Sequence, residues 1–124
     1  MIIVIPVTDE SASRVSEHLG RSPYFVWYSL ENGKIVNSGK VLNDSVHFGG
    51  SGTPPEKIIM LGANGVVSYG MGARALSRFK EKNIVVLEAV SPSPIQNLAA
   101  YTKGELKELT KSCPLNHNCE RVDC

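Results

Sequence analysis

The chain opens on an almost unbroken aliphatic run, Ile2–Val7. A strand with apolar side chains on both of its faces needs a cover on both faces, as in the sheets of α/β proteins. These residues therefore predict a strand inside a sheet that other elements cover on both sides.

A hairpin is predicted next. Tyr24–Leu30 and Lys34–Leu42 have the aromatic and aliphatic content of two strands, and Asn32-Gly33 between them is the strongest short hairpin signal. The polar, glycine-rich stretch Asn43–Gly52 then predicts a mobile loop.

Two capping patterns predict helix starts in the second half, Thr53-Pro54-Pro55-Glu56 and Ser93-Pro94-Ile95-Gln96. In the first pattern the Thr53 hydroxyl can cap, Pro54 fits the first helical position, and Glu56 can reach back to the cap. The further expected elements are a helix end at Gly62, a strand Gly65–Tyr69, a helix from Gly70–Gly72 to about Lys82, a strand Ile84–Glu88, a helix end near Lys103, and another helical turn or two over Glu105–Thr110.

The resulting order, β-β-β-α-β-α-β-α, predicts parallel pairing in the second half and a hairpin in the first. We therefore expect an α/β fold in which residues 1–110 form a single domain with one mixed, five-stranded sheet, flanking helices and right-handed crossovers. Residues 111–124 show no apolar period, and we expect a flexible tail that is poorly ordered without metal.

The composition of the chain limits the classes of partner that it can bind. The chain has 124 residues and a formal net charge of +1, so it lacks the broad basic field that holds nucleic acid. Its longest apolar run is too short to span a bilayer and lacks the basic start and cleavage site of a signal peptide. We expect a cytoplasmic protein with neither a nucleic-acid nor a membrane partner.

The stretch VSEHLGRSP places His18 in a turn between an acid and a leucine–glycine pair, with Arg21 close behind. A neutral imidazole is a common metal ligand, and a guanidinium can meet an anionic group. A loop after the first strand lies at a sheet end where α/β proteins bind ligands. We expect His47, in the glycine-rich HFGGSG, to contribute there as well. The alternative for His18 is a loop histidine in solvent.

A second candidate is Gly70-Met71-Gly72-Ala73-Arg74-Ala75, which follows a predicted strand and matches G-x-G-x-x-[GA]. Glu88, eighteen residues after Gly70, stands near the position of a ribose-binding acid. A full dinucleotide fold needs two such halves, and too little chain follows. The turn can instead serve close strand–helix packing, or the helix start can bind another anion, which we favour over a nucleotide.

The third candidate is the tail, where three cysteines and a histidine form C-x3-H-x-C-x4-C. Zinc commonly takes such a ligand set. The possible ligands are Cys113, His117, Cys119 and Cys124. The spacing is not a standard pairing, so the alternative is a flexible segment that merely contains thiols. An odd, terminal cluster does not suit a secreted disulfide scaffold.

The stretch VSEHLGRSPYF resembles the motif of the dinitrogenase iron–molybdenum cofactor biosynthesis family, which includes NifX and the C-terminal part of NifB. The usual form of the motif is close to V-S-E-H-F-G-R-A-P-Y-F. The likeness continues through PEKIIMLGANGVVSYGMGARALSRFKEKNIVV and covers roughly residues 1–105. Leu19 replaces the usual phenylalanine but keeps an apolar anchor.

The resemblance implies an RNase H-like fold whose second strand is antiparallel. It also implies a non-enzymatic carrier of an iron–sulfur or iron–molybdenum-type cluster, related to nitrogen fixation and served by cluster donor and acceptor proteins. His18 is then the residue that holds the cluster, and the cysteine tail is a candidate for an added iron–sulfur site. A nuclease is excluded because Ile2–Val7 carries no carboxylate for magnesium. The alternative function is a small nucleotide- or anion-binding module that uses Gly70 and Gly72.

Overall fold

The computed structural model describes residues 1–9, 11, 14–17, 19, 22–43 and 53–109. It contains one five-stranded sheet with the strand order β3-β2-β1-β4-β5. The elements are β1 (Ile2–Val7), β2 (Tyr24–Glu31), β3 (Lys34–Leu42), α1 (Pro54–Met60), β4 (Gly65–Ser68), α2 (Ala73–Glu81), β5 (Val85–Glu88) and α3 (Pro94–Thr102).

The sheet is mixed, as the sequence predicts. β2 pairs antiparallel with both β1 and β3, whereas β4 pairs parallel with both β1 and β5. The α/β fold with five strands and flanking helices is therefore confirmed, and β1 is its central strand. None of the helices that the structure describes is long and apolar enough to cross a lipid bilayer.

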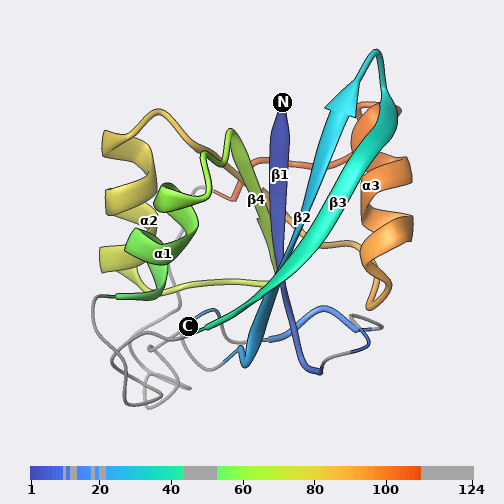
Figure 1. The fold of residues 1–124 in the computed structure, drawn as a ribbon. Coiled ribbons are helices and arrows are strands. Elements are labelled where there is room, and N and C mark those ends of the chain that lie inside the picture. Colours follow the sequence, from blue (N-terminus) through green and yellow to red (C-terminus); the bar gives the residue numbers. More distant parts are fainter. Residues whose placement is uncertain (10, 12–13, 18, 20–21, 44–52, 110–124) are drawn as a thin grey trace.

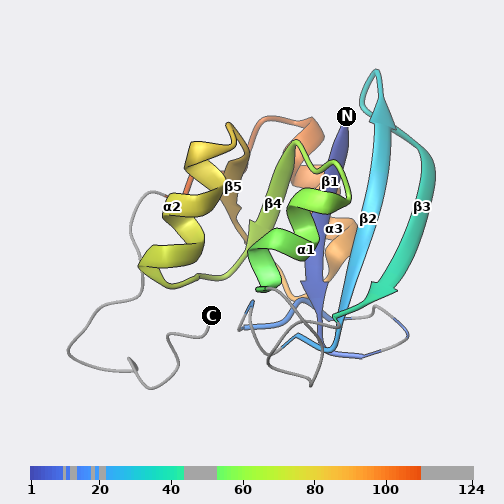
Figure 2. The same ribbon diagram turned by 60° about the vertical axis from the view of Figure 1, so that its left-hand side comes forward.

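The helices cover the two faces of the sheet unequally: α1 and α2 lie on one face and α3 lies on the other (Figures 1 and 2). β1 contributes side chains to the hydrophobic cores on both faces of the sheet. Ile3, Ile5 and Val7 belong to the core that contains Leu98 of α3, while the side chain of Val4 belongs to the core under α1 and α2. This two-sided burial explains the aliphatic run, since each fully buried side chain contributes about 1.5–3 kcal/mol.

The hairpin turn has the backbone that Asn-Gly favours. Asn32 and Gly33 have φ angles of 52° and 77°, and positive φ at both central residues is what a type I′ turn requires. Glycine and asparagine reach this region at little cost.

The capping pattern of α1 is only half formed. The Thr53 hydroxyl accepts a hydrogen bond from the Glu56 amide at 3.4 Å, as predicted. The Glu56 carboxylate, however, does not reach back to the cap but forms an ion pair with Arg78 of α2. The expected local contact gives way to one that fastens the two helices on this face together.

The predicted extra helical turn at Glu105–Thr110 is wrong. The described part of this segment runs beside β5, with an antiparallel bridge between Leu87 and Glu108. The Leu109 amide donates to the Val86 carbonyl at 2.8 Å. Gly104, with a φ of 72°, turns the chain out of α3. The edge strand β5 offers backbone groups that need partners, and the segment supplies them.

Candidate functional site

The strands β1, β3, β4 and β5 all end at the same edge of the sheet, which we call the carboxyl edge. The amino ends of the helices also lie there (Figure 1). Ligands of open α/β sheets bind outside the carboxyl ends of strands. The segment between β1 and β2 and the start of the segment after β3 lie at this edge.

The segment after β1 is anchored to the sheet on both sides of the predicted histidine ligand. Val15 forms an antiparallel bridge with Val7, and the Ser16 amide donates to the Pro6 carbonyl at 2.8 Å. Leu19 is only 1% exposed and belongs to the core under α1 and α2. Leucine therefore does act as the apolar anchor expected at this position of the motif.

A buried asparagine joins this segment to the end of β3. The Asn43 side-chain Nδ2 donates to the Ser22 carbonyl at 2.7 Å, and the Asn43 backbone amide donates to the Pro23 carbonyl at 2.9 Å. Asn43 is 1% exposed. The chain that leaves β3 toward residues 44–52 therefore starts beside the chain that enters β2.

A second buried asparagine, Asn97 of α3, holds the loop after β5. Its Oδ1 accepts from the Val90 amide, and its Nδ2 donates to the Ser91 and Ser93 carbonyls, each at 2.8 Å. Both donors and one acceptor position of the amide are used, so the loop backbone has a defined path.

The loop after β5 in turn supports the segment after β1. The Pro92 carbonyl accepts a hydrogen bond from the Val15 amide at 2.7 Å. A chain of contacts therefore runs from Asn97 in α3, through Pro92, to the residues that precede the predicted histidine ligand. Directional hydrogen bonds of this kind fix a position more narrowly than apolar contact does.

The glycine turn between β4 and α2 is held by its own residues. The buried Ser68 hydroxyl donates to the Gly70 carbonyl at 3.0 Å, and its oxygen accepts from the Gly70 amide at 3.3 Å. Met71 is fully buried. Gly72 has a φ of −70°, which any residue can adopt. The predicted close strand–helix turn accounts for these features without a bound ligand.

The start of α2 nevertheless suits negative charge. Gly72, its N-cap, offers no side-chain hydrogen bond, and the first turn contains no acidic residue. The first amides of such a helix attract anions. Glu88 ends the neighbouring strand opposite Ser68 and is exposed.

Most of the predicted ligands fall outside the described residues. These are His18, Arg21, His47, Cys113, His117, Cys119 and Cys124. Gly70 and Gly72 are described and lie at the carboxyl edge. Within the described ranges, no group of three or more His, Cys, Asp or Glu side chains could hold a metal ion.

The roles of the two buried asparagines are not evident from the sequence. Asn43 reads as the first residue of a polar loop and Asn97 as an ordinary helical residue. Their partners lie 21 residues away for Asn43 and between four and seven residues away for Asn97. A buried asparagine inside a helix leaves no mark in the hydrophobic periodicity of the sequence. Its role in holding a loop is therefore visible only in the packed structure.

Comparison with known families gives one clear match. The sequence profile described as dinitrogenase iron–molybdenum cofactor matches residues 1–104. An uncharacterized protein of Methanocaldococcus jannaschii, MJ0580, is 29% identical over 111 residues, which is 87% of this chain and 91% of that protein.

Solved structures share the fold. The crystal structure of PH0822 has a TM-score of 0.76 and 32% sequence identity, and the match covers 90% of this chain and 98% of that one. The apo form of the orange protein from Desulfovibrio gigas has a TM-score of 0.75 at 14% identity, over 91% of this chain and 96% of that one. The second likeness shows the fold alone.

Proposed function

The chain belongs to the dinitrogenase iron–molybdenum cofactor family, and we propose that it carries an iron–sulfur or iron–molybdenum-type cluster at the carboxyl edge of its sheet. The cluster is cargo, received from a donor protein and passed to an acceptor protein, and no catalysis is required of the chain. The reduced cytoplasm suits such a cargo, because its thiols and clusters stay intact there.

The observation that carries the proposal is the bracing of two histidine-bearing segments at one edge. The residues around His18 are anchored to β1, and the segment that contains His47 starts from Asn43, which is hydrogen-bonded to Ser22. Two imidazoles attached to neighbouring anchors can reach one ligand. We assign His18 as the main ligand and His47 as the second contributor.

Two positive features favour an anionic cargo. Arg21 follows His18 by three residues, and its guanidinium supplies a permanent charge that complements sulfide-rich clusters. Gly70 and Gly72 lead into the α2 start, whose free amides add partial positive charge at the same edge. Imidazole nitrogen and an adjacent cation fit a metal cluster with net negative charge.

The tail is proposed as a separate site. Cys113, His117, Cys119 and Cys124 suit zinc or an iron–sulfur centre by ligand type. In this assignment the tail receives or hands on metal, while the carboxyl edge stores the cluster.

A second function, binding of a free anion or nucleotide by the Gly70–Gly72 turn, is favoured by the uncapped start of α2. Glu88 at the end of β5 is then the group that meets a ribose hydroxyl. The two functions differ in the role of His18. It is a cluster ligand in the first function and has no part in the second.

The test is anaerobic transfer of an iron–sulfur cluster from a donor to the protein, with retained iron measured after gel filtration. We expect His18→Ala to lose most of the retained iron, Arg21→Ala to lose less, and a variant with all three cysteines changed to serine to keep the edge-bound cluster. Urea unfolding of each variant provides the stability control. If His18→Ala keeps as much iron as the wild type, the assignment of the cluster to the carboxyl edge is wrong. If only the serine variant loses iron, the cluster is bound by the tail.

A further inference from the structure

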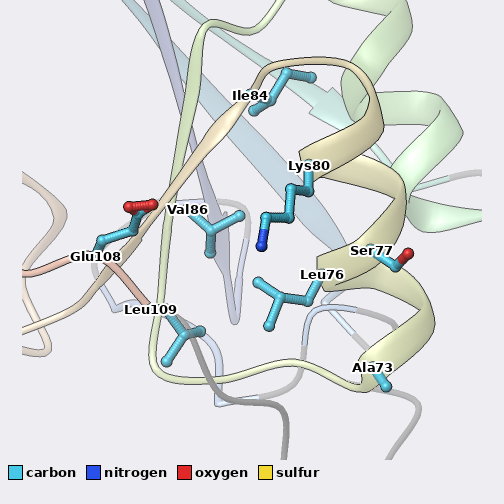
Figure 3. Close-up of a pocket in the computed structure, with 8 residues that line it drawn as sticks. All are labelled: Ala73, Leu76, Ser77, Lys80, Ile84, Val86, Glu108 and Leu109. Carbon is cyan, nitrogen blue, oxygen red and sulfur yellow. The ribbon is translucent and has the colours of Figure 1, made fainter.

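A cavity of about 330 Å³ lies outside the carboxyl edge, between α2 and the segment that follows Gly104 (Figure 3). Ala73, Leu76, Ser77 and Lys80 line one side of it. Their spacing of three, four and seven residues places them on one stripe of the helix. Ala75 and Phe79 occupy the neighbouring, buried stripe, and Leu76 of the cavity stripe packs against the same core.

The floor of the cavity is apolar and fixed. Ile84 and Val86 are buried, and Leu76 and Leu109 are half-buried. The opposite wall is pinned to the sheet, because the Leu109 amide donates to the Val86 carbonyl at 2.8 Å. The bridge between Glu108 and Leu87 fixes the same wall. A ligand would therefore meet a surface that is already formed.

Two opposite charges border this floor without pairing. Figure 3 shows the Lys80 ammonium extending from α2 over the floor, whereas the Glu108 carboxylate lies beside β5, with Val86 between the two groups in this view. In the described part of the chain neither forms an ion pair, with the other or with any other residue. By contrast, Arg78, two positions earlier on α2, pairs with both Glu56 and Glu81.

We propose that this cavity binds a small apolar α-amino acid as its zwitterion. The ligand carboxylate meets Lys80, the ligand ammonium meets Glu108, and the side chain lies on the floor of Leu76, Ile84, Val86 and Leu109. The volume is at the lower end of the roughly 300–1,000 Å³ typical of small-molecule sites, which suits a ligand the size of leucine. This site is independent of the proposed cluster carrier function, since none of its residues is a predicted cluster ligand.

The test is a titration of the isotope-labelled full chain with L-leucine, followed through the backbone amide resonances of Leu76, Lys80, Val86 and Leu109. Two analogues dissect the charges: 4-methylpentanoate lacks the ammonium and 3-methylbutylamine lacks the carboxylate. We expect saturable shifts at the cavity and weaker binding of both analogues. Lys80→Met keeps the aliphatic stem and should raise the Kd of leucine about 10-fold, the usual effect of losing a charge-assisted hydrogen bond.

Glu108→Gln should weaken the binding of leucine. The binding of 4-methylpentanoate should stay unchanged or become tighter, because the repulsion between the Glu108 carboxylate and the ligand carboxylate disappears. Lys82→Met is the matched control, since it removes a cation from the end of the same helix outside the cavity, and it should leave the Kd unchanged. The proposal fails if leucine gives no saturable shift, if the three ligands bind equally, or if Lys80→Met and Lys82→Met have the same effect. Because all three substitutions lie at exposed positions, a folded variant is expected in each case.

Discussion

Asn97→Ala tests the bracing of the carboxyl edge at its most buried point. The side chain is fully buried and makes three hydrogen bonds of 2.8 Å to the loop after β5. A typical intramolecular hydrogen bond contributes a net ~1 kcal/mol. The loop backbone is only partly buried, so water can reach the groups left behind. The expected loss of unfolding free energy is therefore about 3 kcal/mol, at the lower end of what three orphaned groups can cost.

The assay is urea unfolding followed by circular dichroism, with Gln96→Ala as the neighbour control. Gln96 is exposed, and its side chain accepts one hydrogen bond, from Ser91. We expect this control to change the unfolding free energy by less than about 1 kcal/mol. A loss of under about 1 kcal/mol for Asn97→Ala, with an unchanged m-value, would refute the reasoning that this amide is structurally important.

The same variant has a functional consequence. Without Asn97 the loop loses its defined path, and the Pro92 carbonyl that accepts from the Val15 amide is less well placed. At a temperature where the variant is fully folded, we expect iron retention after cluster transfer to fall, while Gln96→Ala behaves as the wild type does. Equal retention in Asn97→Ala would show that the loop does not position the segment before His18.

Three other predictions concern an ion pair, a buried side chain and the cysteine tail. Arg78 lowers the pKa of the Glu56 carboxyl, chiefly by a hydrogen bond, so this pair stabilises the fold at neutral pH and the contribution is lost as the pH falls through the lowered pKa. Glu56→Gln should remove that part of the pH dependence in a series of urea unfolding curves, and an unaltered acid limb would contradict it. Leu19→Ala should cost about 2–5 kcal/mol, as for a buried leucine, and a smaller loss by thermal unfolding would show that the motif position is not an anchor. Cobalt(II) added to the reduced protein should give a thiolate charge-transfer band if residues 113–124 bind metal, and its absence would leave the tail without a site.

The parts of the fold that were predictable from the sequence are those set by local physics. The two-sided apolar run Ile2–Val7 requires a central strand, Asn32-Gly33 supplies the positive φ angles of a type I′ turn, and Thr53 and Ser93 cap their helices through their hydroxyls. In each case the signal and the structure that it specifies lie within a few residues of each other.

The features of the structure that were predicted wrongly or not at all depend on contacts between residues that are distant in sequence. The Glu56 carboxylate pairs with Arg78, 22 residues away, and not with the cap of its own helix. Residues 105–109 leave the helical pattern because β5 has an open edge. The cavity charges Lys80 and Glu108 come from elements that only the sheet brings together. Local patterns carry no information on these choices.

The two buried asparagines suggest why a carrier would support its edge with polar groups. Apolar side chains can fill the same space in several ways, since dispersion contacts are weak and non-directional. The amides of Asn43 and Asn97 each accept only a narrow arrangement of the backbone groups around them. A histidine that must meet a metal cluster within a bond length gains from such neighbours, because ligand groups held in place lose less freedom when the cargo arrives. The bracing lies in the described residues next to the histidine segments, so a cluster would meet anchors that are already formed before it binds.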